Sequence, residues 1–354
     1  MVVYKMTGKS STSNRSGKYA RQRRGFLLDR MRPYLRLIMV MLFATLTMLS
    51  LFIGALDGVT LRALLEGDEI ARLVFIHSRV PRTMAIILSA AGLSVAGLIM
   101  QAISRNKFMS PTTAGTTDAA ALGLLLSFIF LSEQSGITQT IFSFVFALIS
   151  TMLFTFIIGR LKIREVVYIP LLGMMYGGMI SALTTAIAFR FEAMQVLNMF
   201  NMGSFARLGD FRMIYIVIFP LILSMVFATK FSIIGLGEDF SKNLGVNYNR
   251  VVMSGLIAVA LISAATFVAV GPLPFIGLII PNMTTSLYGD NLKKSIFDLM
   301  LFGAVFVLIC DIISRLVIFP FEMNVSLTIS IIGGAIFMIY LIRGLSDGRE
   351  RRVS

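Results

Sequence analysis

Few residues in this chain could carry out catalytic chemistry. His77 is the one histidine and Cys310 the one cysteine among 354 residues. A single histidine excludes a metal site built from histidines and leaves little material for a Ser-His-Asp triad. A single cysteine excludes an internal disulfide and a cysteine-based metal centre. We therefore expect no catalytic or metal-binding residues, and the charged side chains become the candidates for function.

Two carboxylates, Asp118 and Asp311, lie inside long apolar segments, where an ionisable group is a functional candidate by default. Asp311 precedes Arg315 by four residues, one helical turn, so this spacing predicts a structural ion pair. Asp118 directly follows the run Pro-Thr-Thr-Ala-Gly-Thr-Thr, whose small residues allow helices to approach closely. For Asp118 the pattern favours a helix cap or a hydrogen bond over ion transport.

The composition shows which elements must position these residues. Apolar residues make up 56% of the chain, charged residues 14%, and the mean hydropathy is +0.85. A soluble protein of this length could not cover its surface with so few charges. The apolar runs are about 20 residues long, as a helix needs to cross the hydrocarbon core of a bilayer. The chain is therefore predicted to be an all-α, polytopic membrane protein.

Ten charge-poor segments are predicted to span the membrane. The first is 37–56; a secretory signal is the alternative, but its apolar core would be only about 7–15 residues long. Glycines recur within the segments, as at Gly97 and Gly173, and predict close helix packing. The other nine segments are 83–104, 112–131, 138–159, 167–189, 213–229, 251–270, 274–288, 299–314 and 324–342.

The uncharged stretch 251–289 is too long for one span, because as a helix it would measure about 58 Å. Gly271, Pro272 and Pro274 predict a break in it, since proline removes a helical donor and clashes with the preceding turn. The second half is short and contains Gly277 and Pro281. Such a broken span must be shielded by protein or line a wet cavity, because lipid cannot hydrogen-bond its backbone.

Charge distribution predicts the orientation. About three quarters of the 32 Lys and Arg residues fall in the N-terminal tail, the C-terminal tail and alternate loops, which are therefore predicted to be cytoplasmic. This explains the net charge of +14 without a nucleic-acid partner. We expect a largely disordered basic tail (1–36), a ten-span domain (37–343) and a cytoplasmic C-terminal tail (344–354).

The cytoplasmic segment 236–247 is predicted to form a short amphipathic helix. Glu238 and Asp239 suit the positive end of a helix dipole, and Gly245 after Leu244 suits a left-handed C-terminal cap. Phe240 and Leu244 fall on one face. A helix this short needs a cover for its apolar face. The cover is either the protein's own helix ends or a groove on a cytoplasmic partner.

On the opposite side, Arg79, Pro81 and Arg82 stand directly before the second span. Proline there predicts a helix start, and both arginines are expected to point into water. Arginine suits bidentate capture of carboxylates on a soluble partner. The alternatives are a stop-transfer signal and contact with lipid phosphate.

Several loops together resemble the FecCD-type permeases, the membrane subunits of bacterial ABC importers for iron-siderophores, haem and cobalamin. The resemblance runs from about residue 35 to 343, with Asn282 where many members have histidine. The sequences of segments 106–115 and 237–241 are most similar to those of the branch that imports catecholate siderophores such as petrobactin and anguibactin. The matching motifs are Arg79-Val-Pro-Arg82, the segment from Arg105 to Pro111, the segment from Gly237 through Glu238, Asp239, Phe240 and Leu244 to Gly245-Val246, and Gly271-Pro272-Leu273-Pro274 through Gly277 to Pro281-Asn282.

The resemblance implies a ten-span fold and a pair of permeases, a heterodimer in preference to a homodimer, with a translocation path along their interface. Two ATPase subunits carrying ATP and magnesium would dock below, and a siderophore-binding protein above. Arg79, Arg82 and Arg315 match the arginines that receive the binding protein's carboxylates. The segment from Glu238 to Val246 matches the helix that sits in the ATPase cleft.

Three classes of function are compatible with a polytopic membrane protein: an ABC permease, a secondary carrier and an intramembrane enzyme. The chain has no Gly-x-x-x-x-Gly-Lys-Ser/Thr phosphate loop, so an ABC permease would take its ATP hydrolysis from a partner and would not itself be an enzyme. An ion-coupled secondary carrier would need membrane-embedded ionisable groups, for which Asp118 and Asp311 are the candidates. An intramembrane enzyme lacks its signature, because the sequence has no His-Glu-x-x-His.

Overall fold

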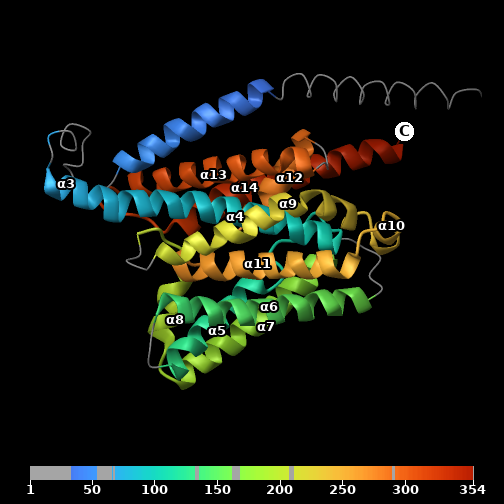
Figure 1. Cartoon of the computed structure of the whole chain (residues 1–354), viewed down its shortest axis with the longest axis horizontal. Helices are drawn as coiled ribbons and strands as arrows, with labels where there is room; N and C mark the ends of the chain where they lie inside the picture. The colour runs from blue at the N-terminus through green and yellow to red at the C-terminus, as the bar shows by residue number, and fades with distance from the viewer. Residues whose placement is uncertain are drawn as a thin grey trace, which may run out of the picture.

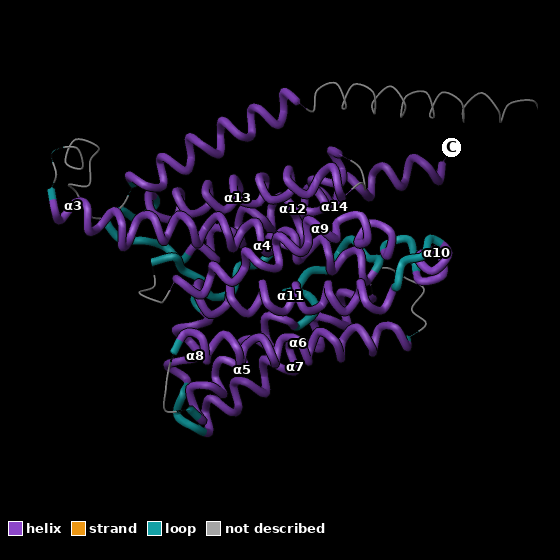
Figure 2. The backbone as a smooth tube through the Cα atoms, in the orientation of Figure 1, coloured by secondary structure: helices purple, strands orange, loops and turns teal. Residues whose placement is uncertain are grey.

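The computed structural model describes residues 33–53, 66, 68–131, 135–161, 168–206, 211–288 and 292–353. The described part is helical and contains no strand (Figure 2). Most of the predicted basic tail, residues 1–32, lies outside the described residues. The elements are a first helix, Pro33–Phe52, followed by α3 (Glu69–Val74), a π-helix (Phe75–Arg79), α4 (Val80–Ser104), α5 (Thr116–Phe130), α6 (Gly136–Arg160), α7 (Tyr168–Arg190), α8 (Met194–Asn201), a 3-10 helix (Phe211–Val217), α9 (Ile218–Ile234), α10 (Glu238–Asn243), α11 (Tyr248–Val270), α12 (Ile276–Tyr288), α13 (Leu292–Leu316) and α14 (Val325–Val353).

Within the described residues, eight helices are long and apolar enough to cross a membrane, and α5 and α12 are shorter apolar helices. These ten correspond in order to the ten predicted segments, which confirms the all-α polytopic fold. α10 and the C-terminal end of α14 lie at one end of the bundle, and α3 and α8 lie at the other (Figure 1). α14 continues to Val353, so the predicted C-terminal tail continues the last helix.

The prediction that Pro81 starts the second span was wrong. The helix begins at Glu69, where the Asp68 side chain accepts hydrogen bonds from the amides of Ile70 and Ala71, and it runs without interruption to Ser104. A wide π turn immediately precedes Val80, whose N–H donates to the carbonyl of Phe75 five residues back. This wider turn makes room for a proline ring that a regular helix interior would reject.

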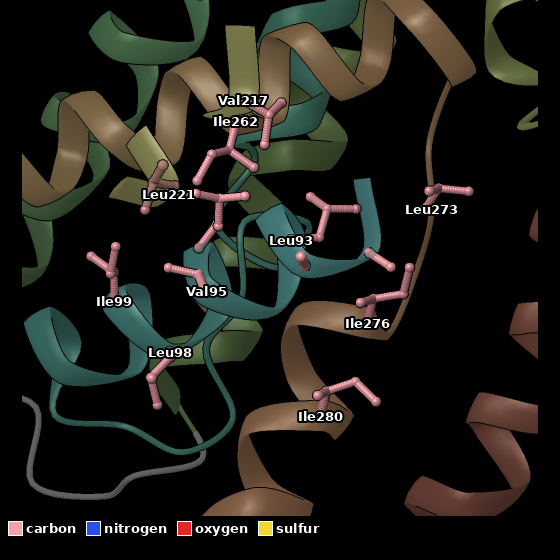
Figure 3. Packing of buried hydrophobic residues seen from close by; sticks show 14 of the residues in the cluster. Leu93, Val95, Leu98, Ile99, Val217, Leu221, Ile262, Leu273, Ile276 and Ile280 are labelled. Atoms are coloured by element: carbon pink, nitrogen blue, oxygen red, sulfur yellow. The ribbon is translucent and has the colours of Figure 1, made fainter. Parts of the chain in front are cut away.

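α4 is the central helix of the bundle. It is mostly buried, as is α11, whereas α7, α14 and the first helix are mostly exposed. Figure 3 shows Leu93 and Ile99 of α4 packed among side chains such as Val217, Ile262 and Ile276 from the surrounding elements. The exposed apolar helices therefore surround a core that α4 and α11 organise, and they face lipid or another chain.

The predicted break after α11 is confirmed. Gly271 ends the helix at φ +95°, and residues 271–275 link α11 to α12 without helical structure. The neighbouring loop takes up a freed acceptor, because the amide of Ser204 donates to the carbonyl of Val270 at 3.0 Å. Gly203 of this loop has no room for a side chain beside Pro272. Protein therefore shields part of the break, and Pro272 also borders a cavity, so both sequence-based alternatives apply.

A backbone contact between α4 and α12 explains Gly277 of the broken segment. A Cβ atom added at Gly97 would lie 1.9 Å from the carbonyl oxygen of Gly277. The two helices therefore touch through their backbones, the geometry that small residues permit between membrane helices.

Replacing Gly97 with valine should prevent this contact. We expect Gly97→Val to lower stability by more than the roughly 1–3 kcal/mol typical of overpacking, because the obstructing atoms are backbone. Thermal unfolding in detergent measures the effect. Gly178→Ala is the matched control, since a Cβ there meets nothing within 4 Å and alanine favours helix. Equal unfolding midpoints for the two variants would refute the backbone contact.

Candidate functional site

Arg82 of α4 holds two carboxylates at the end of the bundle that contains α3. Its Nη1 donates to both oxygens of Glu322, at 3.0 and 2.7 Å, and its Nη2 donates to Asp311 Oδ1 at 3.0 Å. Asp311 lies on α13 and is fully buried, and Glu322 follows that helix in the connection to α14. One guanidinium therefore ties α4 to α13 and to the loop beyond it.

Arg315 shares Asp311 and extends the cluster to the first helix. Its Nη2 forms an ion pair with Asp311 one turn earlier, which confirms the predicted pair. Its Nη1 donates to the backbone carbonyls of Ser50 and Ile53 at 3.0 and 2.8 Å. Arg79 Nη1 also donates to Ile53, at 2.6 Å. The end of the first helix is thus held by two arginines from two other helices.

The expectation that Arg79 and Arg82 point into water was wrong. Arg79 and Arg315 are buried, and the Arg82 side chain is only 11% exposed. Three guanidinium groups surround two carboxylates, and the Nε atom of each arginine lacks a hydrogen-bond partner. The cluster therefore keeps an excess of positive charge and of donors. The role of these residues in docking a binding protein stays a prediction.

Sequence reasoning did not find Glu322. It comes after α13 has ended, among turn residues, so no helical period relates it to Arg82 or Arg315. It is also the most accessible carboxylate of the cluster, with its side chain 18% exposed.

Asp311 should contribute more to stability than Glu322. Asp311→Asn leaves two buried arginines without their shared anion, which typically costs about 3–5 kcal/mol. Glu322→Gln removes a partly hydrated partner and should cost about 1 kcal/mol or less. The unfolding midpoints of the two variants in detergent test this order, and a larger loss for Glu322→Gln would contradict it.

At the other end of the bundle, α10 is fixed through Ser241. This buried hydroxyl donates to the carbonyl of Gly237 at 2.6 Å and also contacts the carbonyl of Ile233, in the last turn of α9, at 3.2 Å. The helix is shorter than the predicted 236–247. It closes at Gly245, whose φ of +73° confirms the predicted left-handed cap. The amide of Val246 donates to the carbonyl of Ser241 at 2.9 Å.

The helix ends in the described part of the chain leave the apolar face of α10 largely uncovered. Phe240 and Leu244 are each about half exposed, at 51% and 55%. Glu238 and Lys242 are also exposed, and their side chains pair at 2.8 Å. That contact raises the pKa of the Lys242 ammonium group. The helix therefore offers two apolar side chains and an ion pair to a partner.

Asn282 joins α12 to the loop after α4. Its Nδ2 donates to the carbonyls of Lys107 and Leu278, both at 2.7 Å, and its side chain is buried. This position therefore needs an N–H donor that reaches the loop, which the amide supplies.

Asp118 lies in the first turn of α5, whose N-cap is Gly115 at φ +71°. Its side chain caps no other residue. The predicted helix-cap role of Asp118 was therefore wrong, because the N-cap of α5 is Gly115 and the helix has no side-chain cap hydrogen bond. It faces Gly177 of α7, where an added Cβ would lie 2.7 Å from Asp118 Oδ2.

The described residues contain no group of three or more His, Cys, Asp or Glu side chains that could hold a metal ion. With a helical bundle of membrane-spanning length, an exposed apolar helix at one end and a buried arginine cluster at the other, the chain has the architecture of a membrane transport subunit. It matches the FecCD transport family over residues 39–343 and belongs to that family.

Known proteins agree with this assignment. The chain is 42% identical to the petrobactin import system permease protein YclN of Bacillus subtilis, over 88% of this chain and 97% of that protein. It is 36% identical to the ferric-anguibactin transport system permease protein FatD of Vibrio anguillarum, over 86% and 98%. A solved structure described as an inward-facing conformation of a metal-chelate type ABC transporter shares the fold, with a TM-score of 0.74, 23% identity and coverage of 88% and 99%.

Proposed function

We propose that this chain is the permease subunit of a bacterial ABC importer that carries a ferric siderophore into the cytoplasm. The exposed apolar face of α10, in a chain of the FecCD family, carries this proposal, because it provides a docking surface for an ATPase. The substrate class rests on the relatives, two of which are named for petrobactin and anguibactin. Haem or cobalamin is the alternative substrate within the family.

The ATPase subunits bind ATP and magnesium and close on α10 from the cytoplasm. Because Ser241 bonds α10 to the end of α9, and Val246 continues toward α11, a push on α10 moves both membrane helices. In this mechanism the 238–246 segment transmits force, and the motion of α9 and α11 against α4 alternates access to the path.

The binding protein docks at the arginine cluster. Its carboxylates take the place of Glu322 on Arg82 and supply the acceptor that the buried donors of Arg79 and Arg315 lack. Charge-assisted, bidentate bonds to guanidinium groups suit such an exchange. The docked state then loosens the connection between α4 and the α13–α14 loop.

A second permease pairs with this chain through exposed apolar helices, for which α7 and α14 are the candidates. The translocation path follows that interface, beside the break formed by Gly271, Pro272 and Pro274. A heterodimer is the preferred form and a homodimer the alternative. The complex resides in the bacterial cytoplasmic membrane with both termini of this chain in the cytoplasm.

Reconstitution separates this function from a secondary carrier. Proteoliposomes with two permeases, ATPase and binding protein should accumulate ferric petrobactin or ferric anguibactin only with ATP. Proteoliposomes with this chain alone should show no ion-driven uptake. Uptake by the chain alone, driven by an ion gradient, would make it a carrier, and uptake of haem or cobalamin in preference would change the substrate.

Charge on the apolar face of α10 should uncouple transport. Leu244→Asp places a carboxylate at the contact with the ATPase, so we expect assembled membranes to hydrolyse ATP while uptake falls at least tenfold. Asn247→Asp is the control, because it adds the same charge three residues away at the N-cap of α11, where aspartate also caps. Normal uptake by Leu244→Asp would argue against force transmission through α10.

A further inference from the structure

A cavity of about 260 Å³ lies between α5, α7, α8 and the break after α11. Leu197, Phe267 and Pro272 contribute apolar walls. The remaining lining is rich in oxygen atoms, which an apolar bundle does not need for packing. The polar lining residues are Thr117, Asp118, Ser181, Thr184, Thr185 and Asn201.

The carboxylate of this cavity lies near the middle of the membrane. Thr116, two residues before it, contacts Thr151 of α6 through their hydroxyls at 2.9 Å. Thr151 and Gly177, which faces Asp118, each lie about nine residues, or roughly 13 Å, from the cytoplasmic end of their helices. The cavity extends from this depth past Thr184 toward Phe267, near the outer end of α11.

Asp118 has no cationic partner among the described residues. Asp311 is neutralised by two arginines, whereas the ion pairs of the described part do not include Asp118. An uncompensated carboxylate at this depth is costly, because little water is available there to solvate its charge. Such a cost is consistent with a cation that is present when the protein works.

The wall formed by α7 opens at the cavity. Gly173, Gly177, Thr184 and Ala188 form the buried stripe of this helix. Ser181 falls on the same stripe by helical spacing but is exposed, because the cavity lies beneath it. Gly177 leaves the space beside Asp118 free. The carboxylate and the Ser181 hydroxyl therefore border the same opening.

We propose that Asp118 and the hydroxyl and amide groups around it form a binding site for a singly charged cation that enters from the outer side. One carboxylate among neutral oxygens matches one positive charge, and divalent ions generally require more carboxylates. The cavity has room for several water molecules, so it accepts an ammonium group of an organic permeant or a hydrated alkali ion. Binding of an ammonium group rests on the proposed function, because that function supplies the organic permeant. Binding of an alkali ion does not depend on it.

Thiol labelling tests the charge and the direction of access. Ser181→Cys in the assembled complex is treated from outside with a trimethylammonium or a sulfonate methanethiosulfonate, and buried Cys310 gives little background. The preference is the labelling rate with the cationic reagent divided by the rate with the anionic reagent. For Ser181→Cys this ratio should be roughly threefold or more higher than for Glu192→Cys, an exposed site outside the cavity. Adding Asp118→Asn should remove the excess at position 181 and leave position 192 unchanged. Equal preferences at both sites, or no labelling of Ser181→Cys from outside, would overturn the proposal.

Thermal unfolding distinguishes the two sources of cation. Potassium, sodium or propylammonium chloride is titrated into the purified chain, with tetraethylammonium, which has no N–H donor, keeping the ionic strength constant. We expect the unfolding midpoint to rise saturably by a few degrees, as for a ligand at a concentration well above its Kd. The rise should be lost in Asp118→Asn, weakened in Thr117→Val, which keeps the side chain's shape, and retained in Glu192→Gln.

Stabilisation by alkali ions assigns the site to free ions, and stabilisation by propylammonium alone assigns it to an ammonium group on the permeant. No stabilisation by any of the three cations, or the same rise in Asp118→Asn, refutes the site. If the wild-type complex fails to import ferric siderophore while propylammonium still stabilises it through Asp118, the proposed function fails and the site stands.

Discussion

Hydrocarbon offers no hydrogen bonds, so the backbone polar groups of a membrane-spanning bundle must find their partners in the protein. Asp311 receives Arg82 and Arg315 together, and Arg315 in turn satisfies the backbone carbonyls at the end of the first helix. The same constraint explains why Ser204 bonds to Val270 beside the broken span. These polar contacts add directional links between helices that otherwise pack mainly through apolar side chains.

The two ends of the bundle handle charge in opposite ways. At the end that contains α3, guanidinium groups are buried and three of their N–H donors lack acceptors, so under the proposed function a docking carboxylate would replace Glu322 there. At the end that contains α10, the charged pair of Glu238 and Lys242 is exposed, and the contact that fixes the helix is the neutral hydroxyl of Ser241. An outer partner would therefore change the bonding within the permease, whereas an inner partner would move α10 as a preformed unit.

Local rules in the sequence predicted what depends on local chemistry. The break at Gly271, the left-handed Gly245 and the pairing of Asp311 with Arg315 follow from residue type and helical spacing. Partners distant in sequence could not be predicted this way, as Glu322 shows. The helix start at Pro81 was wrong because a preceding π turn offsets what proline normally disrupts. Ser241, which anchors α10, was not predicted, because the apolar pattern singles out Phe240 and Leu244 and gives no sign that a neighbouring hydroxyl is buried.

Asp118 and Asp311 lie in the same apolar bundle, but only Asp311 has cationic partners in the described part of the chain. Two arginines surround Asp311 where helices must be joined, so its charge is used in the structure. Asp118 borders a cavity lined by oxygens, with glycine rather than a cation opposite it. If the carboxylate only had to satisfy packing, asparagine or threonine would serve without the cost of a charge. An acid at this position is explained if a positive charge passes through or rests in the cavity, because its arrival offsets the cost of a partly buried anion.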